Sequence, residues 1–253
     1  MIRFASLGSG SKGNALLVEV GRTRVLLDCG FGPRELSRRL ARLDVAPESI
    51  TAVLITHEHA DHVGGAARCA ARFGWTVHAS FGTAAASRQL DGTPVRRFDS
   101  HTSFAIGDLE IHPYPVPHDA REPTQFVFAD GEARLGVLTD AGSITPHIVA
   151  MLKDCAALVL ECNHDPAMLA NGRYPPPLKQ RISSAYGHLD NGQAAGLLRR
   201  VAHGGLRHVV AAHLSEENNR PELARAALAG ALGCSADWIG VASQDAGCDW
   251  RML

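Results

Sequence analysis

The chain has 253 residues, of which 45% are hydrophobic and 20% are charged, and its formal net charge is -1 at pH 7. This composition is typical of a globular protein with a sizeable core, and the charge excludes a protein that coats nucleic acid through bulk positive potential. The N-terminus lacks the apolar stretch of a signal peptide, and no apolar run is long enough to cross a bilayer, so we expect a cytoplasmic protein without a membrane partner.

The first half of the chain is predicted to contain short strands and two helices. Runs rich in β-forming residues cover residues 2–7, 16–20, 23–27 and 52–56. Helical spacing of apolar residues covers 33–43 and 64–73. Residues 76–139 alternate short apolar runs with Gly, Pro and Asp turns, which predicts an antiparallel sheet.

The second half begins with a predicted buried strand over 157–160. Residues 163–189 show no clear periodicity and include three consecutive prolines, which is typical of a functional loop. Asp190 is predicted to cap a helix, a strand over 209–212 ends at His213, and a last helix covers 221–232. We therefore predict one domain over residues 1–253 with an αββα architecture, in which two mixed sheets face each other and helices lie outside.

The six cysteines show neither CxxC pairing nor zinc-ribbon spacing, which predicts reduced, mostly buried thiols rather than metal ligands. Metal-binding groups are concentrated instead in Thr56-His57-Glu58-His59-Ala60-Asp61-His62, where three imidazoles and a carboxylate fall within six residues. Nitrogen and hard oxygen ligands without sulfur suit Zn, Mn or Fe. The alternative is a polar surface turn in which Asp61 only caps a helix, but four fixed positions at this spacing rarely coincide by accident.

The turn resembles the HxHxDH signature of the metallo-β-lactamase superfamily. The rest of the chain offers that superfamily's remaining ligands in the same order along the sequence. The resemblance implies that His118, in the segment Val116-Pro117-His118-Asp119, completes a first metal site together with His57 and His59.

The same resemblance implies a second metal site in which His213 joins Asp61 and His62. Asp140 would bridge the two ions, and Asp28 would support the histidine turn from behind. Two divalent ions about 3.5–4 Å apart stabilise both the attacking and the leaving oxygen of an in-line displacement, which suits phosphodiester hydrolysis.

Three further stretches bear on the substrate, and each allows two interpretations. The Gly/Ser segment 7–14 could form an anion-binding nest of backbone N–H groups or a flexible hairpin turn. The basic residues of 172–181 could bind phosphates or form a solvated loop face. His188 could point toward the metals or be an exposed imidazole.

Six blocks of sequence together resemble the YycJ/WalJ family, small metallo-β-lactamase-fold proteins regarded as bacterial DNA exonucleases. The blocks are SGSKGN, THEHADH, PVPHDAREP, ECNHDPAML, NGRYPPPLKQRISSAYGHLDN and HLSEENN. The resemblance spans residues 9–219 and implies hydrolysis of DNA from an end, in the 5′ to 3′ direction, in replication-linked repair. It also implies Mn or Zn as the cofactor, with Fe compatible, and a homodimer is compatible with it.

Carried over residue by residue, the resemblance implies a substrate-binding set that faces the DNA phosphates: Asn14, Lys179, Arg181, Ser183 and Ser184. Asp61 and His188 are the predicted catalytic residues, and His188 would contact the scissile phosphate or protonate the leaving oxygen. His164 is a candidate for the same pocket. The chain departs from the family at Asp190, where a Ser is expected, although both residues cap helices.

Two other functions compete with a DNA exonuclease. A small-molecule thioester or lactone hydrolase of the glyoxalase II or lactonase type would use the same metals against a carbonyl. An apolar acyl pocket would favour it, and the basic loop argues against it. A non-catalytic metal-binding or regulatory protein would lack one or more ligands, whereas all of them are present.

Overall fold

The strands form two seven-stranded sheets, as the computed structural model describes them over residues 1–253. The first sheet, in the order β14-β1-β2-β3-β4-β5-β6, consists of β1 (Ile2–Gly8), β2 (Ala15–Val20), β3 (Thr23–Leu27), β4 (Ala52–Ile55), β5 (Thr76–Ser80), β6 (Val95–Phe98) and β14 (Cys248–Met252). The second, in the order β13-β12-β11-β10-β9-β8-β7, consists of β7 (Phe104–Ile106), β8 (Leu109–Pro115), β9 (Thr124–Ala129), β10 (Arg134–Leu138), β11 (Ala157–Glu161), β12 (His208–Ala212) and β13 (Gly240–Val241). Each sheet combines parallel and antiparallel pairs, so the predicted mixed sheets are confirmed.

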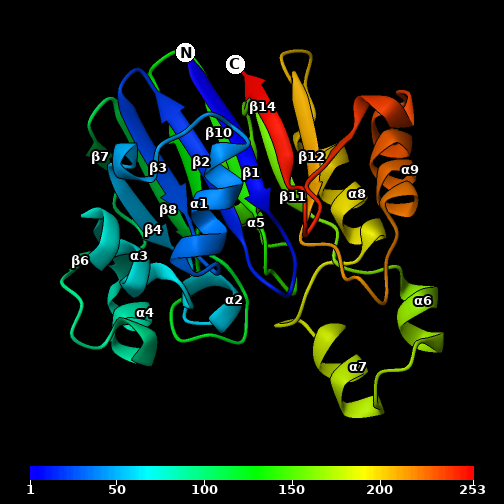
Figure 1. The fold of residues 1–253 in the computed structure, drawn as a ribbon. Helices are drawn as coiled ribbons and strands as arrows, with labels where there is room; N and C mark the ends of the chain where they lie inside the picture. The colour runs from blue at the N-terminus through cyan, green and yellow to red at the C-terminus, as the bar shows by residue number, and fades with distance from the viewer.

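Helices lie outside the two sheets (Figure 1). Those connected with the first sheet are α1 (Pro33–Ala41), α2 (Ala60–Val63), α3 (Ala66–Phe73) and α4 (Phe81–Ala86). Those connected with the second are α5 (Pro146–Leu152), α8 (Asn191–Val201) and α9 (Pro221–Leu232), while α6 (Pro166–Asn171) and α7 (Pro176–Ile182) follow β11. The predicted αββα architecture is therefore confirmed. None of these helices is both long and apolar enough to span a bilayer.

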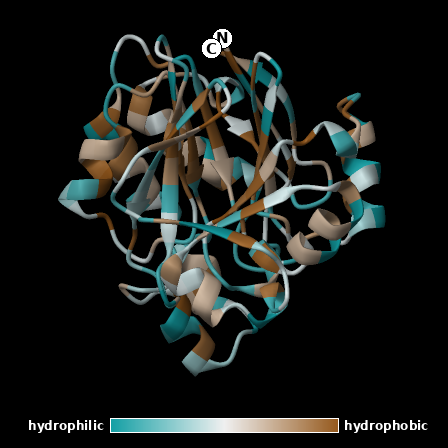
Figure 2. Cartoon of the chain, turned by 90° about the vertical axis from the view of Figure 1, so that its left-hand side faces the viewer, coloured by the Kyte–Doolittle hydropathy of each residue, from teal (hydrophilic) through white to brown (hydrophobic).

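Alternation along the strands explains why both faces of the sheets are covered. In β2, Leu16 and Val18 point into the core between the sheets, whereas Leu17 points into the core under α1 and α3. A third core lies between the second sheet and α5, α8 and α9. Hydrophobic residues accordingly concentrate along the strands, and hydrophilic residues are frequent on the outer helices and loops (Figure 2).

Two expectations for the middle of the chain need correction. Residues 76–139 do not form one antiparallel sheet, because in the first sheet β5 pairs in parallel with β4 and β6 pairs in parallel with β5. The intervening helices return the chain to the same end before each new strand, which makes these pairs parallel. Residues 163–189 are not wholly irregular: they contain α6 and α7, and Pro176 and Pro177 lie in the first turn of α7, where an absent N–H costs no hydrogen bond.

Side chains with metal-binding chemistry gather where the parallel strands end. Asp28 follows β3, Asp140 lies just beyond β10, and His213 follows β12. All three have left-handed backbone angles, with φ of 62°, 51° and 55°. Such angles are uncommon for residues other than glycine and turn the side chain sharply away from the strand direction. This end of the sandwich lies opposite the two termini (Figure 1).

Candidate metal centre

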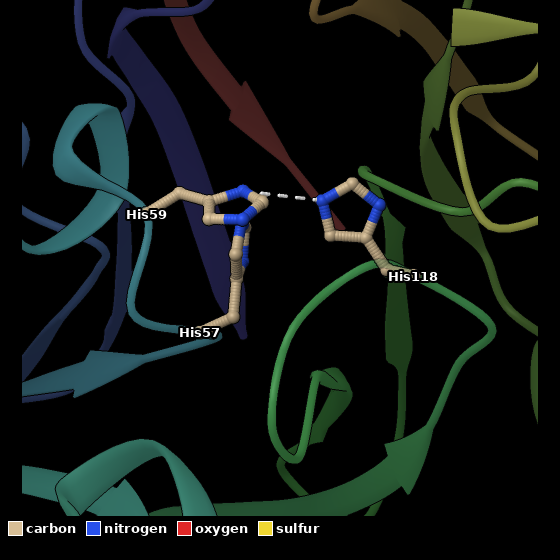
Figure 3. A group of neighbouring side chains, drawn as sticks. All are labelled: His57, His59 and His118. Carbon is tan, nitrogen blue, oxygen red and sulfur yellow. Dashed lines mark hydrogen bonds between the residues drawn. The ribbon is translucent and has the colours of Figure 1, made fainter. Parts of the chain in front are cut away.

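His57, His59 and His118 form a group that we call the first trio. Their ligand atoms lie within 4.8 Å of one another. His57 follows β4, His59 precedes α2, and His118 lies in the loop after β8, so two sheets contribute to the group. The three rings converge on one point, and His118 Nε2 lies 3.3 Å from His59 Nδ1 (Figure 3).

Asp61, His62 and His213 form a second trio beside the first. Asp61 Oδ2 lies 3.3 Å from His62 Nε2 and 3.6 Å from His213 Nε2. Asp61 and His62 belong to α2, the short helix that follows His59, whereas His213 arrives from the end of β12.

Asp140 lies between the two trios and is almost fully buried. Its Oδ2 is 3.3 Å from His62 Nε2 in the second trio, and its Oδ1 is 4.0 Å from His118 Nε2 in the first. A carboxylate in this position can offer one oxygen to each of two neighbouring cations. The seven side chains predicted as ligands from the sequence are thus brought together in space.

The chemistry of these atoms fits divalent cations. His57 Nε2, His213 Nε2 and Asp140 Oδ2 are buried and have no hydrogen-bond partner within the protein. Buried polar atoms without partners are costly, and a cation supplies the missing interaction. Burial by itself lowers the pKa of His213, but Asp140, Asp61 and Glu161 raise it to about 10. The site therefore stabilises positive charge, and its mixture of nitrogen and oxygen donors suits Zn or Mn.

Residues behind the trios orient the imidazole rings. His62 Nδ1 donates to Asp28 Oδ2 over 2.7 Å, so Asp28 lies directly behind the second trio. The Thr56 hydroxyl lies 3.0 Å from each Asp28 oxygen and 2.9 Å from His57 Nδ1. Such partners select the tautomer of a ligating histidine and hold its orientation. Thr56 was not predicted, although it directly precedes the histidine turn.

Glu161 is the main residue that the sequence analysis missed. This fully buried carboxylate, at the end of β11, accepts hydrogen bonds from His188 Nδ1 at 2.8 Å and His213 Nδ1 at 3.1 Å. The backbone N–H groups of Ala141 and Leu189 also donate to it. One signal was available in the sequence: Glu161 is the only charged residue of an otherwise apolar strand. It lies at the end of that strand, a position similar to that of Asp28 directly after β3.

The cleft in front of the trios has about 360 Å³ accessible to water and is lined by His59, Asp61, Asp140 and His188 among others. Arg181 also lines it; its side chain is 60% exposed, and its Nε lies 2.6 Å from Asp119 Oδ2. Only five of the 16 residues that line the cleft are hydrophobic, so the apolar acyl pocket expected for a thioester or lactone hydrolase is not evident.

The other predicted substrate-binding residues lie in different settings. Lys179 donates to the Ala170 carbonyl, and the hydroxyls of Ser183 and Ser184, just after α7, donate to carbonyls in its last turn. Their predicted contacts with DNA stay predictions. His164 is buried and does not line the cleft.

Asn14, also predicted to face phosphates, is 93% buried, since its relative exposure is 7%. Its amide contacts Asp61 and Gly10, so the structure places it behind the second trio instead of at the cleft surface. No free Asn14 amide group is left to meet a phosphate there.

Comparison with known proteins gives a family match over most of the chain. The family model described as "Beta-lactamase superfamily domain" matches residues 23–214. The exodeoxyribonuclease WalJ of Streptococcus pneumoniae serotype 2 is 31% identical over 245 residues, covering 94% of this chain and 91% of WalJ. The exodeoxyribonuclease YycJ of Bacillus anthracis is 34% identical over 228 residues, covering 88% of this chain and 86% of YycJ.

Among solved structures, the metallo-β-lactamase fold protein YhfI of Bacillus subtilis superposes with a TM-score of 0.77. The superposition covers 99% of this chain and 98% of YhfI, at 16% sequence identity. At that identity the similarity concerns the fold alone, and it agrees with the arrangement of two sheets and outer helices described above.

Proposed function

The chain belongs to the metallo-β-lactamase superfamily and, within it, to the family of the WalJ and YycJ relatives, and from this premise we propose that it is a two-metal DNA exonuclease. The observation that carries the proposal is the pair of trios sharing Asp140 at the base of a polar cleft. Two relatives that match nearly full length are named exodeoxyribonucleases, which supports DNA as the substrate.

Each trio would hold one divalent ion, with Asp140 between the two. Bound there, two such ions activate the attacking water and offset the negative charge of the phosphodiester. We propose Zn or Mn, because imidazole and carboxylate ligands suit both, and Fe is compatible with the same set. The protein's own near-zero net charge leaves these ions as the main source of positive potential at the cleft.

His188 would protonate the leaving oxygen. An ionised Glu161 can only accept hydrogen bonds, so His188 Nδ1 keeps its proton toward Glu161 and Nε2 is left for the substrate. Burial lowers the pKa of His188, but the Glu161 and Asp140 carboxylates raise it above the usual value. The two carboxylates therefore favour the protonated ring, which is the form that donates a proton.

Arg181 is the basic residue best placed to bind a DNA phosphate. It lines the cleft with Asp61 and Asp140, and its guanidinium is paired only with Asp119 at the rim. A guanidinium can bind a phosphate through two hydrogen bonds at once, so an incoming strand can compete with Asp119 for Arg181.

We propose removal of nucleotides from the 5′ end, in replication-linked repair, as the family resemblance implies.

Labelled DNA tests this proposal directly. Purified protein with Mn is incubated with duplex DNA labelled at either the 5′ or the 3′ end, and with closed circular DNA. We expect the 5′ label to be released first as a short product, the 3′-labelled strand to shorten progressively, and the closed circle to survive. Chelator and His118→Ala should abolish cleavage, whereas His147→Ala, which changes an exposed histidine of α5, should not.

Two results would overturn the proposal. Cleavage of the closed circle would indicate an endonuclease, and intact duplex beside a rapidly cleaved thioester or lactone would indicate a small-molecule hydrolase. Repair is tested in cells: loss of the protein should increase sensitivity to DNA damage, and His118→Ala should fail to restore resistance.

A further inference from the structure

The segment that joins β1 to β2, residues 9–14, is tightly held, and we call it the glycine loop. Gly10 and Gly13 have φ of 148° and 147°, a backbone conformation that side chains disfavour. A Cβ atom would lie 2.7 Å from Gln244 Oε1 at Gly10 and 2.6 Å from the Phe31 ring at Gly13. Both positions therefore require glycine, and the loop has one defined path instead of the freedom of a surface hairpin.

Every backbone N–H of the glycine loop except that of Ser11, which lines the cleft, donates to a group within the protein. The N–H groups of Gly10 and Lys12 donate to the side chains of Asn14 and Gln244, and that of Gly13 donates to the Gly10 carbonyl. The Lys12 ammonium pairs with Glu216 at 2.6 Å. An anion-binding nest needs several free N–H groups that point to one place. The loop therefore does not have the form of a phosphate cradle.

Asn14 turns its amide toward the second trio. Its Nδ2 lies 3.2 Å from Asp61 Oδ2 and 3.1 Å from His62 Nε2, and it also lies 3.1 Å from the Gly10 carbonyl oxygen. An amide has two N–H groups, so one can bond to Gly10 while the other bonds to Asp61. The Asn14 N–H of the backbone also donates to the Asp61 carbonyl at 2.8 Å. Asn14 thus holds both the backbone and the carboxylate of Asp61.

Ser9, at the other end of the loop, holds the third member of the second trio. The His213 backbone N–H donates to Ser9 Oγ at 2.8 Å. His213 has a left-handed backbone, so this hydrogen bond stabilises a conformation that the residue does not favour by itself. Ser9 Oγ in turn lies 3.4 Å from Asn14 Oδ1, which joins the two anchors into one small network.

The first trio is supported by other groups. His57 Nδ1 contacts the Thr56 hydroxyl, and His118 Nδ1 lies 3.0 Å from the Gly187 carbonyl oxygen, to which it donates. No hydrogen bond joins the glycine loop to a residue of the first trio. The loop therefore reaches only one half of the centre.

We infer that the glycine loop positions the second metal ion, with Asn14 holding Asp61 and Ser9 holding His213. This inference rests on the two-ion centre of the proposed function. Neither Asn14 nor Ser9 ligates the ion: each acts through a ligand. Residues in this role typically change metal affinity by about 10- to 100-fold when they are removed.

Metal content measured by mass spectrometry tests the inference without relying on activity. Wild type, Asn14→Ala and Ser9→Ala are loaded with Zn or Mn, passed through gel filtration and analysed, and each ion is then titrated by calorimetry. We expect two ions per chain in wild type and about one in Asn14→Ala. The dissociation constant of the second ion should rise about 10- to 100-fold in Asn14→Ala, and by less in Ser9→Ala.

The matched control is Asn219→Ala. The exposed fraction of Asn219, 5%, is similar to the 7% of Asn14. The Asn219 amide bonds to Asn191 and to the Cys162 carbonyl and contacts neither trio. This variant should keep two ions. Circular dichroism reports whether Asn14→Ala folds, and if it does not, Ser9→Ala decides the question by the same titration.

The outcomes separate the two proposals. Fewer than two ions in wild type would overturn the two-ion centre and the inference with it. Two tightly held ions in wild type and in both loop variants would overturn the inference alone. Equal weakening of both ions in the variants would also overturn it, because a selective anchor affects one ion.

Discussion

The two trios lie side by side, yet they are held by different kinds of group. Behind the first trio are a hydroxyl and a backbone carbonyl, and His59 is 30% exposed at the cleft. Behind the second are two buried carboxylates, Asp28 and Glu161, and the Asn14 amide. A carboxylate behind a histidine increases its strength as a ligand. The histidine turn 57–62 therefore contributes to both trios, although different parts of the fold support the side chains of each trio.

Replacing Asp140, which lies between the two trios, should affect both ions alike and should lower activity more than any of the other substitutions. In Asp140→Asn we expect loss of both ions and a fall in kcat of roughly 10³-fold, because several kcal/mol of charge stabilisation depend on the ions. Nuclease assays and metal analysis measure this. Asp154→Asn is the control, since Asp154 also has a left-handed backbone, with φ of 60°, but is exposed and outside the centre. If Asp140→Asn kept both ions, the bridging role would be contradicted.

A second pair of variants separates proton transfer from metal binding. In His188→Ala we expect kcat to fall about 10²-fold, as for a lost general acid, while two ions are retained. Glu161→Gln should lower kcat and also weaken the second ion, because Glu161 contacts both His188 and His213. Rate measurements beside calorimetric titration distinguish the two. Metal loss in His188→Ala would show that its role is ligation instead of proton donation.

The carboxylate behind His62 offers the sharpest test of the asymmetry. In Asp28→Asn the affinity of the second ion should fall about 10- to 100-fold while the first ion stays bound. Asn keeps the size of the side chain and tolerates the left-handed backbone at this position, where φ is 62°. Calorimetry with a stepwise metal titration measures both affinities. Equal weakening of both ions would mean that the two trios share one support.

On the side of the first trio, Arg181 should affect substrate binding more than chemistry. Its partner Asp119 lies 3.4 Å from His118 Nε2, which ties the pair to this trio. In Arg181→Ala we expect KM for DNA to rise about tenfold with little change in kcat, as for one lost charged hydrogen bond. Arg173→Ala, on the exposed part of the same loop, is the comparison. A fall in kcat without a change in KM would contradict a binding role.

The last prediction lies outside the centre, has no expected effect on activity, and concerns the stability of the fold in acid. Burial, aided by Arg96, lowers the pKa of His78 to about 4. The unfolded chain binds a proton at His78 near pH 6.5, whereas the folded protein binds it only near pH 4. The free energy of unfolding should therefore fall as the pH drops from 6.5 to 4, by about 3 kcal/mol. His78→Gln should flatten this dependence in thermal melts of metal-free protein. If the pH dependence of the melting temperature were unchanged in His78→Gln, groups other than His78 would cause the loss of stability in acid.

Local signals in the sequence were sufficient for most of the elements and for the four candidate ligands of the histidine turn. The helix Pro221–Leu232 has the predicted bounds because Pro and Gly mark its ends, and Asp190 caps α8 as predicted. The histidine turn was recognised because its spacing is a property of six neighbouring residues. By contrast, the parallel pairing of β5 and β6 depends on helices that return the chain, and no local pattern encodes that.

The sequence by itself determined which residue types are available for a metal centre and in which order they occur. Only the tertiary structure decided that Glu161 stands behind His188 and His213, and that Asn14 faces Asp61 instead of solvent. The reason is physical: the direction of a loop side chain and the partner of a buried carboxylate are set by strand ends that meet when two sheets pack. Residues more than a hundred positions apart become neighbours there, and the periodicity of the sequence does not predict such contacts.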